Sequence, residues 1–100
     1  NYEIKVTTLS VSDRIGSILE LLNTSDSVTF DSLFTVLNSK QEVIVTFLAI
    51  LELMRMQLIR TQQTRQFDVI RIYAAVDRET QEEILKGFYD AGEKEIPLVK

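Results

Sequence analysis

The stretch VIVTFLAILELMRMQ, residues 43–57, constrains the fold more than any other part of the chain. Its apolar residues recur at helical spacing, and Ser39-Lys40-Gln41-Glu42 before it is a capping box, so a helix is predicted to begin near Ser39. The stripe expected to face the core contains Val43, Phe47, Ile50, Leu51 and Met54, with Ile44 at its edge. One stripe is enough to dock a helix on its own domain. A second apolar set falls elsewhere on the helical wheel and needs a cover of its own: Val45, Leu48, Ala49, Leu53 and Met56.

Two further helices are predicted before this one. Ser10 and Asp13 form an N-cap box, and apolar residues follow at helical spacing to about Asn23. A shorter helix is expected from Phe30 to Leu37, where apolar residues fit the i, i+3, i+4, i+7 pattern. The few residues between it and Ser39 are what a helix-turn-helix requires. Residues 1–9 include a strand-like piece, and residues 28–29 are either a short strand or an extended link.

After Gln57 the pattern changes from helical spacing to partial alternation. Residues 58–64 and 67–73 are predicted to pair as a β-hairpin, joined by a polar link at about 64–66. This order of elements predicts an α+β winged helix, in which a three-helix helix-turn-helix core carries a β-hairpin wing. We expect the winged-helix domain to occupy residues 1–76. Residues 77–100 are predicted to be a C-terminal tail with a short helix at 78–91.

The residue types that are missing restrict the chemistry of the chain. It has no cysteine and no histidine, and its only glycines are Gly16, Gly87 and Gly92. Disulfides, Cys/His metal sites, Ser-His-Asp triads and phosphate-cradling loops are therefore excluded. Glu79, Glu82 and Glu83 fit a solvated helix face better than a Mg²⁺ site or an acid/base pair. We expect no enzyme, no cofactor and no metal. No apolar run is long enough to span a membrane, so no membrane association is expected. Since the chain does not begin with Met, we also expect a fragment of a longer protein.

Two classes of function compete for a winged helix of net charge −4. One is a DNA-binding transcriptional regulator, whose recognition helix needs exposed polar or basic side chains for base edges and phosphates. The middle of this helix instead offers Leu48 and Glu52, and an acidic balance weakens phosphate binding. The wing residues Arg60, Arg65 and Arg71 could touch a DNA backbone but are more often solvated charges. We therefore expect no sequence-specific binding to nucleic acid.

The other class is a protein-binding winged helix, in which the recognition face is apolar because it docks on another protein. Fully burying a Leu or Met side chain contributes roughly 1.5–3 kcal/mol, so a few anchors can carry an interface. Two other covers for the second apolar set remain open. One is the N-terminal piece, the wing or the tail of the same chain, and the other is weak self-association through the same face.

The run EVIVTFLAILELMRMQLIRTQQTRQFDVIRI, residues 42–72, resembles the C-terminal domain of the bacterial kleisin family ScpA, segregation and condensation protein A. The family's E-V-V-V-T-F-L-A-L-L-E-L string corresponds to residues 42–53 here, and its F-x-x-I strand corresponds to Phe67 and Ile70. VTFDSLF at residues 28–34 is also similar, so the likeness covers about residues 10–73. Asp68 stands where many members have Gly, and the tail has no counterpart in the family.

The resemblance implies a non-enzymatic role in chromosome condensation and segregation. It implies that this domain binds the ATPase head of an SMC protein and that the kleisin bridges two heads. Another part of the full-length kleisin would bind ScpB, and the complex would lie in the cytoplasm at the nucleoid. By exclusion from the core stripe, the head-binding residues are predicted on the 43–57 helix and, as a second candidate, on the wing, whose exposed strand edge can extend a partner's sheet. They are Val45, Leu48, Ala49, Glu52, Leu53, Met56, Phe67 and Ile70. We expect Leu48→Arg or Leu53→Arg to leave the fold nearly intact and Phe47→Arg to unfold it.

Overall fold

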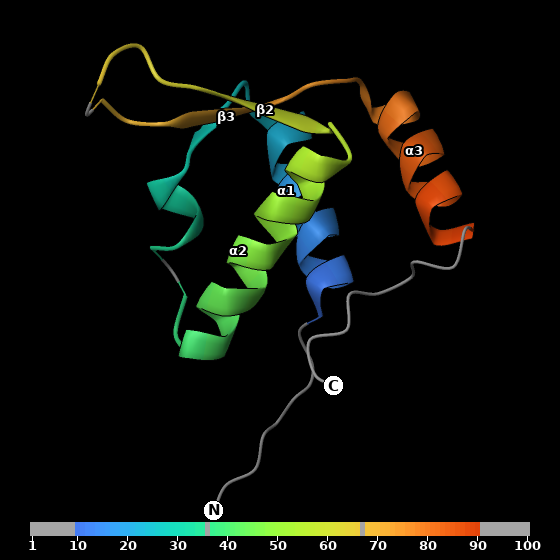
Figure 1. Ribbon diagram of the computed structural model, residues 1–100, viewed down its shortest axis with the longest axis horizontal. Helices are drawn as coiled ribbons and strands as arrows, with labels where there is room; N and C mark the ends of the chain where they lie inside the picture. The colour runs from blue at the N-terminus through green and yellow to red at the C-terminus, as the bar shows by residue number, and fades with distance from the viewer. Residues whose placement is uncertain (1–9, 36, 67, 91–100) are drawn as a thin grey trace, which may run out of the picture.

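The computed structural model describes residues 10–35, 37–66 and 68–90. Its elements, in order, are α1 (Val11–Thr24), β1 (Val28–Thr29), the 3₁₀ helix η1 (Asp31–Leu33), α2 (Lys40–Arg55), β2 (Ile59–Gln62), β3 (Arg71–Ala74) and α3 (Arg78–Asp90). α1 and α2 lie beneath a small antiparallel sheet, α3 stands at one end, and the β2–β3 hairpin projects at the other (Figure 1). This is the α+β winged helix that the sequence predicted. The strand-like piece expected in residues 1–9 lies outside the described residues.

The first two α-helices begin at the predicted caps. The Ser10 hydroxyl accepts a hydrogen bond from the Asp13 N–H at 3.1 Å, and the Ser39 hydroxyl accepts one from the Glu42 N–H at 3.1 Å. The Glu42 carboxylate accepts from the Asn38 N–H at 2.8 Å, so this box closes one residue before the N-cap. Each bond satisfies a backbone donor that a helix start leaves without an intrahelical partner.

The C-terminal end of α2 is a Schellman motif built around Gln57. This residue has a φ of 62°, in the left-handed region that usually takes glycine. The Gln57 N–H donates to the Met54 carbonyl at 3.0 Å, and the Leu58 N–H donates to the Leu53 carbonyl at 2.9 Å. Leu53 and Leu58 are both fully buried, which provides the apolar contact that accompanies such an end. The motif ends α2 and directs the chain into β2.

The helix expected from Phe30 to Leu37 is wrong in extent, because the structure contains only the short η1. The reason lies in hydroxyl groups that bond the local backbone. Ser32 Oγ donates to the Thr29 carbonyl at 2.7 Å, and Thr29 Oγ1 accepts from the Ser32 N–H at 3.2 Å. Such side-chain bonds compete with helical ones and favour a tight turn. Leu33 still reaches the core, as its place in the apolar pattern required.

The sheet has the order β1-β3-β2, and both pairs of strands are antiparallel. Val28 lies opposite Ile72, so residues 28–29 form a short strand rather than an extended link. The predicted hairpin link of residues 64–66 is too short, because regular pairing ends at Gln62 and resumes at Arg71. Within that loop the Gln63 side-chain amide donates to the Asp68 carbonyl at 2.7 Å, and the Asp68 N–H donates to the Arg65 carbonyl at 3.0 Å. The wing is therefore a short two-stranded base with a longer, internally bonded tip.

The core lies where α1 and α2 meet the inner face of the sheet. Its buried apolar residues are Val11, Ile15, Ile18, Leu19, Leu22, Leu33, Val45, Ala49, Ile50, Leu53, Leu58, Ile59 and Ile72. Two polar residues, Thr46 and Gln81, are buried with them. This arrangement leaves the other side of α2 open to solvent.

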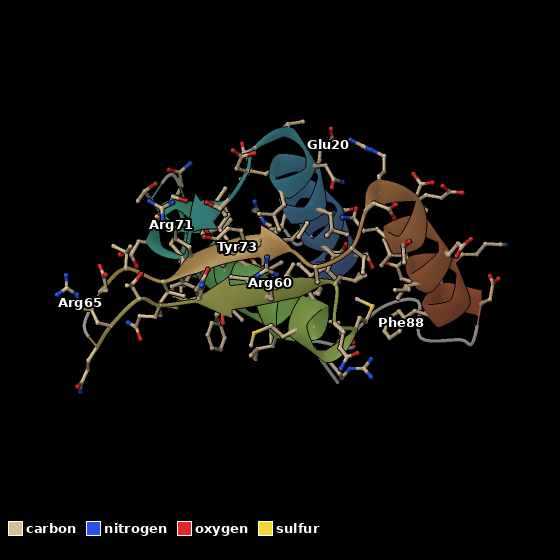
Figure 2. All side chains as sticks on the ribbon, turned by 90° about the horizontal axis from the view of Figure 1, so that it is seen from above. Glu20, Arg60, Arg65, Arg71, Tyr73 and Phe88 are labelled. Atoms are coloured by element: carbon tan, nitrogen blue, oxygen red, sulfur yellow. The ribbon has the colours of Figure 1, made fainter. Side chains whose placement is uncertain are left out.

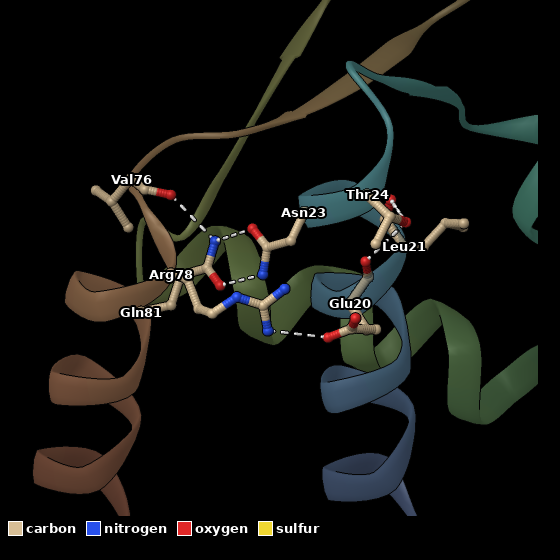
Figure 3. A network of polar contacts seen from close by, with 7 residues as sticks. All are labelled: Glu20, Leu21, Asn23, Thr24, Val76, Arg78 and Gln81. Atoms are coloured by element: carbon tan, nitrogen blue, oxygen red, sulfur yellow. Dashed lines mark hydrogen bonds and ion pairs between the residues drawn. The ribbon is translucent and has the colours of Figure 1, made fainter.

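α3 packs on α1 through a polar network (Figure 3). Asn23 and Gln81 are joined by two side-chain hydrogen bonds, and Gln81 also donates to the Val76 carbonyl at 3.0 Å. Arg78 pairs with Glu20 at 3.1 Å on the exposed side. Ile84 and Leu85 add partly buried apolar contacts at the edge of the core. A helix thus occupies the segment where one was expected at 78–91, whereas the boundary between a 1–76 domain and a 77–100 tail stays a prediction.

Candidate protein-docking surface

Five large apolar side chains of α2 are exposed on one face of the helix. Between 41% and 50% of the surface of each is open to solvent, in Val43, Ile44, Phe47, Leu51 and Met54. We call these five residues the α2 apolar face. Singly scattered apolar residues are ordinary on a protein surface, but contiguous ones mark interaction sites. This face is therefore the first candidate for a functional surface.

The α2 apolar face is the stripe that the sequence placed in the core, and that prediction is wrong. The structure buries the other side of the helix, where Val45, Thr46, Ala49, Ile50 and Leu53 are each at most 3% exposed. Three predicted head-binding residues, Val45, Ala49 and Leu53, are thus core residues. Of the predicted core stripe only Ile50 is buried.

The physical reason for this reversal is helix packing. α1 meets α2 along the side that carries small or β-branched side chains, because short side chains allow two helices to approach closely at interior packing density. Helical spacing alone had grouped Phe47, Leu51 and Met54 as the core stripe. Thr46 also concealed the core side, since a polar residue at 1% exposure interrupts its apolar pattern.

The remaining predicted head-binding residues have mixed positions. Leu48 is partly buried and lines a groove described below, and Met56 packs partly buried against the core. Glu52 pairs with Arg55 on the same helix, and its side chain is only 13% exposed. Ile70 is 37% exposed and lies beside Phe30, whose N–H donates to the Ile70 carbonyl at 2.8 Å. Phe67 lies outside the described residues.

An apolar groove of about 630 Å³ runs between the η1 segment and α2. One wall comes from Phe30, Asp31, Phe34 and Thr35, and the other from Val43, Ile44, Phe47 and Leu48. The rings of Phe30 and Phe34 have centroids 5.1 Å apart and are tilted by 47°. Since Val43, Ile44 and Phe47 also belong to the α2 apolar face, the groove and the face form one continuous surface. A pocket of this composition suits apolar side chains.

Sequence reasoning missed the groove because it placed Phe30 and Phe34 on the core side of a regular helix. In the shorter η1 both rings are only partly buried and turn toward α2. The aromatic spacing itself was the available signal, since Phe30 and Phe34 are neighbours whether the segment is helical or a tight turn. What could not be read was which way the pair faces.

Asp31 is the charged residue in the wall of the groove, and Arg55 lies at the far end of α2. Arg55, at the last turn of α2, bonds Glu52 and lies with its guanidinium carbon 5.2 Å from the centroid of the Phe88 ring of α3. The end of α2 is thus tied to α3, away from the groove. Within residues 10–35, 37–66 and 68–90, no three carboxylate, His or Cys side chains gather as a metal site. In the same ranges no helix has the length and apolar character needed to cross a membrane.

Comparison with known proteins gives a consistent result. The model of a family described as "Segregation and condensation protein ScpA" matches residues 1–75, a match that ends before α3 begins. Segregation and condensation protein A of Coxiella burnetii is 38% identical over 66 residues, which are 66% of this chain and 25% of that protein. The same-named protein of Listeria welshimeri is 39% identical over 61 residues, 59% of this chain and 24% of the relative. The same-named protein of Myxococcus xanthus is 41% identical over 64 residues, which are 62% of this chain and 22% of that protein. The chain therefore spans about a quarter of the length of these curated relatives.

Proposed function

This chain belongs to the family of segregation and condensation protein ScpA, and from that premise we propose that its α2 apolar face binds the ATPase head of an SMC protein. The observation that carries the proposal is where the exposed apolar residues lie. Most of the large exposed apolar side chains in the described part of the chain belong to α2, and they adjoin a groove with an aromatic wall. A winged helix of this family needs a protein-docking surface, and this is the surface with the composition of one.

The sizes of the side chains are sufficient for a protein interface. Fully burying a Leu, Phe or Met contributes roughly 1.5–3 kcal/mol, and each residue of the face already has about half of that burial in the free domain. The gain on docking is then about 1 kcal/mol for each residue. Phe47 and Leu51 are the natural anchors because they lie in the middle of the face, where hot spots concentrate. Leu48 and Ile70 keep their proposed role at its edges, whereas Val45, Ala49 and Leu53 lose theirs.

We extend the proposal from this chain to a full-length protein of the same family, since the relatives are about four times as long as the part that this chain matches. It is a non-enzymatic kleisin subunit that bridges two SMC heads, binds ScpB through another part of its chain, and acts in chromosome condensation and segregation in the cytoplasm at the nucleoid. ATP hydrolysis belongs to the SMC heads. This chain supplies a docking domain, and its described residues offer no cluster of ligands for a metal.

The alternative of a DNA-binding transcriptional regulator has less support. The outward side of α2 would have to read base edges, which requires Arg, Lys, Asn, Gln or Ser side chains. The residues that occupy it are Val43, Ile44, Phe47, Leu51 and Met54. A second copy of the chain remains a competitor for the same face, so the experiment has to separate self-association from head binding.

The test is titration calorimetry of the chain against the SMC ATPase head fragment. Phe47→Arg and Leu51→Arg should each weaken binding at least tenfold while the variants keep their thermal melts. Leu21→Arg on α1 is the matched control, since Leu21 is also an apolar residue, 40% exposed, on another helix. It should bind as the parent does. Sedimentation of the chain alone shows whether the face pairs copies. Equal binding by all variants would assign the contact to another surface.

A further inference from the structure

The outer face of the sheet has a composition unlike the rest of the chain. In β3 the side chain of Ile72 is fully buried against the helices, so its neighbours Arg71 and Tyr73 point to the opposite, solvent side. Arg60 lies opposite Tyr73 and Gln62 lies opposite Arg71 in the paired strands, and residues directly opposite share a face. The outer face of the wing therefore carries Arg60 and Arg71, and Arg65 lies at the tip of the hairpin (Figure 2). We call these three residues the wing arginines.

Arg60 and Arg71 each contact a neutral side chain, and none of the three wing arginines has a carboxylate partner among the described residues. The Arg60 guanidinium carbon lies 4.8 Å from the centroid of the Tyr73 ring, and Arg71 donates to the Ser27 hydroxyl at 3.3 Å. By contrast, Arg78 pairs with Glu20 and Lys86 pairs with Asp90. Neutral partners orient a guanidinium and leave its charge uncompensated. The wing thus presents positive charge that the rest of the domain has not neutralised.

This positive charge is concentrated within an acidic chain. Residues 57–76 contain the three wing arginines and a single acidic residue, Asp68, while the whole chain has a net charge of −4. One oxygen of the Asp68 carboxylate accepts from the Val69 N–H at 2.8 Å, which fixes it within the loop. Asp26 and Asp31 flank the base of the sheet in sequence, next to β1. Amide and hydroxyl residues occupy the tip between the arginines, in the run TQQTRQ at residues 61–66.

We propose that the wing arginines bind the phosphodiester backbone of duplex DNA without reading its sequence. Guanidinium groups and side-chain amides are the donors that proteins direct at phosphate oxygens, and such contacts are independent of the base sequence. Arg60 and Arg71 are diagonal neighbours across the strands, a relation in which strand positions are typically about 7–8 Å apart. Successive phosphates on one strand of B-DNA rise by about 3.4 Å along the helix axis, so side chains rooted at two such positions can reach different phosphates. Arg65 extends the row along the projecting hairpin.

The DNA-binding surface and the protein-docking surface can be occupied together. Arg60 and Arg71 lie on the side of the sheet that faces away from the helices, and Arg65 lies at the tip of the hairpin (Figure 2). The α2 apolar face and its groove belong to α2 and the η1 segment, and α2 lies below the sheet (Figure 1). A partner seated on α2 therefore leaves the outer sheet face open. The inference goes beyond head binding, and either one can fail without the other.

The size of the effect follows from the number of contacts. Three neutralised phosphates give a slope of about −2.7 for the logarithm of the binding constant against the logarithm of the salt concentration. Binding should then weaken about 40-fold between 50 mM and 200 mM salt. Nonspecific dissociation constants of about 10⁻⁴–10⁻⁶ M are the expected range.

The experiment is fluorescence anisotropy of a labelled mixed-sequence duplex at several salt concentrations. The test variant is Arg60→Gln/Arg65→Gln/Arg71→Gln, and the matched control is Lys40→Gln/Arg78→Gln/Lys86→Gln, which has the same net charge. We expect the parent and the control to bind with the predicted slope and the test variant to bind at least tenfold more weakly. A third variant with lysine at the three wing positions should retain most of the binding. Thermal melts establish that every variant is folded.

Several results, ending with one for RNA, would overturn the proposal. The first four are no binding by the parent at 50 mM salt, equal binding by the parent and the test variant, an equal loss in the control, and competition by polyglutamate as effective as that by unlabelled duplex. The last of these four would reassign the face to an acidic protein. Two duplexes of unrelated sequence should bind within about twofold of each other, because only phosphates are contacted. A single-stranded RNA competitor of equal length that displaces the duplex more effectively would reassign the site to RNA.

Discussion

Asn23 of α1 and Gln81 of α3 exchange two hydrogen bonds, one in each direction, at 2.8 Å and 3.0 Å. Gln81 is 2% exposed, so the nitrogen and the oxygen of its side-chain amide both depend on protein partners rather than on water. This pair connects the helix beyond the family match to the first helix of the winged-helix core. α3 is therefore attached by specific polar contacts and not only by its thin set of apolar residues.

Replacing Gln81 should loosen that attachment. Gln81→Ala leaves the Asn23 amide and the Val76 carbonyl without their partner, and unsatisfied buried polar groups cost about 1–3 kcal/mol each. The expected drop in melting temperature is roughly 4–8 °C for each kcal/mol in a domain of this size. Glu82→Ala, on the neighbouring exposed position, is the control and should change little. Equal melts for the two variants would mean that the amide pair contributes nothing to the attachment.

The two sides of α2 should respond in opposite ways to arginine. Leu53 is fully buried, so Leu53→Arg places an unpaired charge in the core and should abolish the cooperative melt. Phe47 is 46% exposed, and Phe47→Arg should change stability by only about 0.5 kcal/mol. Circular dichroism melts of both variants check this. A folded Leu53→Arg protein together with an unfolded Phe47→Arg protein would restore the orientation of α2 that the sequence first suggested.

Gln57 provides a site at which a glycine should stabilise the protein. Gln57 lies in the left-handed region, where a non-glycine residue costs about 1–2 kcal/mol of stability. Glycine avoids this cost, but part of the gain is offset because glycine loses more backbone entropy on folding. Gln57→Gly should therefore raise stability by about 0.5–1 kcal/mol, measured by urea unfolding. Gln41→Gly, an equal change inside the first turn of α2, should lower stability by a similar amount. A loss of stability in both variants would show that the side chain of Gln57 contributes more than its backbone strain costs.

The carboxylate of Asp77 at the start of α3 should make a small part of the free energy of unfolding depend on pH. A hydrogen bond from the Thr80 side chain, followed by one from its backbone N–H at 2.9 Å from Asp77 Oδ1, lowers the pKa of the Asp77 carboxyl below its usual value of 3.8. Since the folded pKa is the lower one, the contribution is complete above the unfolded pKa and is lost as the pH falls through the folded pKa. The parent should thus melt above Asp77→Ala at neutral pH, and the difference should shrink below about pH 4. In a Thr80→Ala background, the difference in melting temperature at neutral pH between proteins with and without Asp77→Ala should be smaller, because the side-chain hydrogen bond to the carboxylate is gone. A gap between parent and Asp77→Ala that stays constant down to about pH 2 would contradict this role of the carboxylate.

The parts of the fold that could be predicted are those set by neighbouring residues. Ser10 and Ser39 cap helices because their hydroxyls reach an N–H three residues ahead, a distance that any helix start provides. The same local logic located the two wing strands and α3, and it left residues 28–29 as either a short strand or an extended link. It failed at η1, where local bonds made by Thr29 and Ser32 override the apolar spacing.

The orientation of α2 could not be predicted because both of its sides are apolar. A hydrophobic pattern selects a side only when the opposite side is polar, and here the choice depends on how closely α1 can approach Ala49 and Thr46. The attachment of α3 was equally hidden, since nothing in the sequence marks Asn23 and Gln81 as partners. The site predicted from the sequence and the exposed apolar face therefore lie on the same helix but largely on opposite sides of it.

Because α2 is apolar on both sides, the tendency of the protein to aggregate should depend on how much of it is made. Folding hides one side and leaves the other in contact with water. Under the proposed function a partner covers that side, so copies made in excess of the partner would meet one another at a rate that rises with the square of their concentration. Such surplus chains would be lost to precipitation or proteolysis, while chains bound to the partner would persist. The exposed side of α2 would therefore require balanced synthesis of the subunit and its partner.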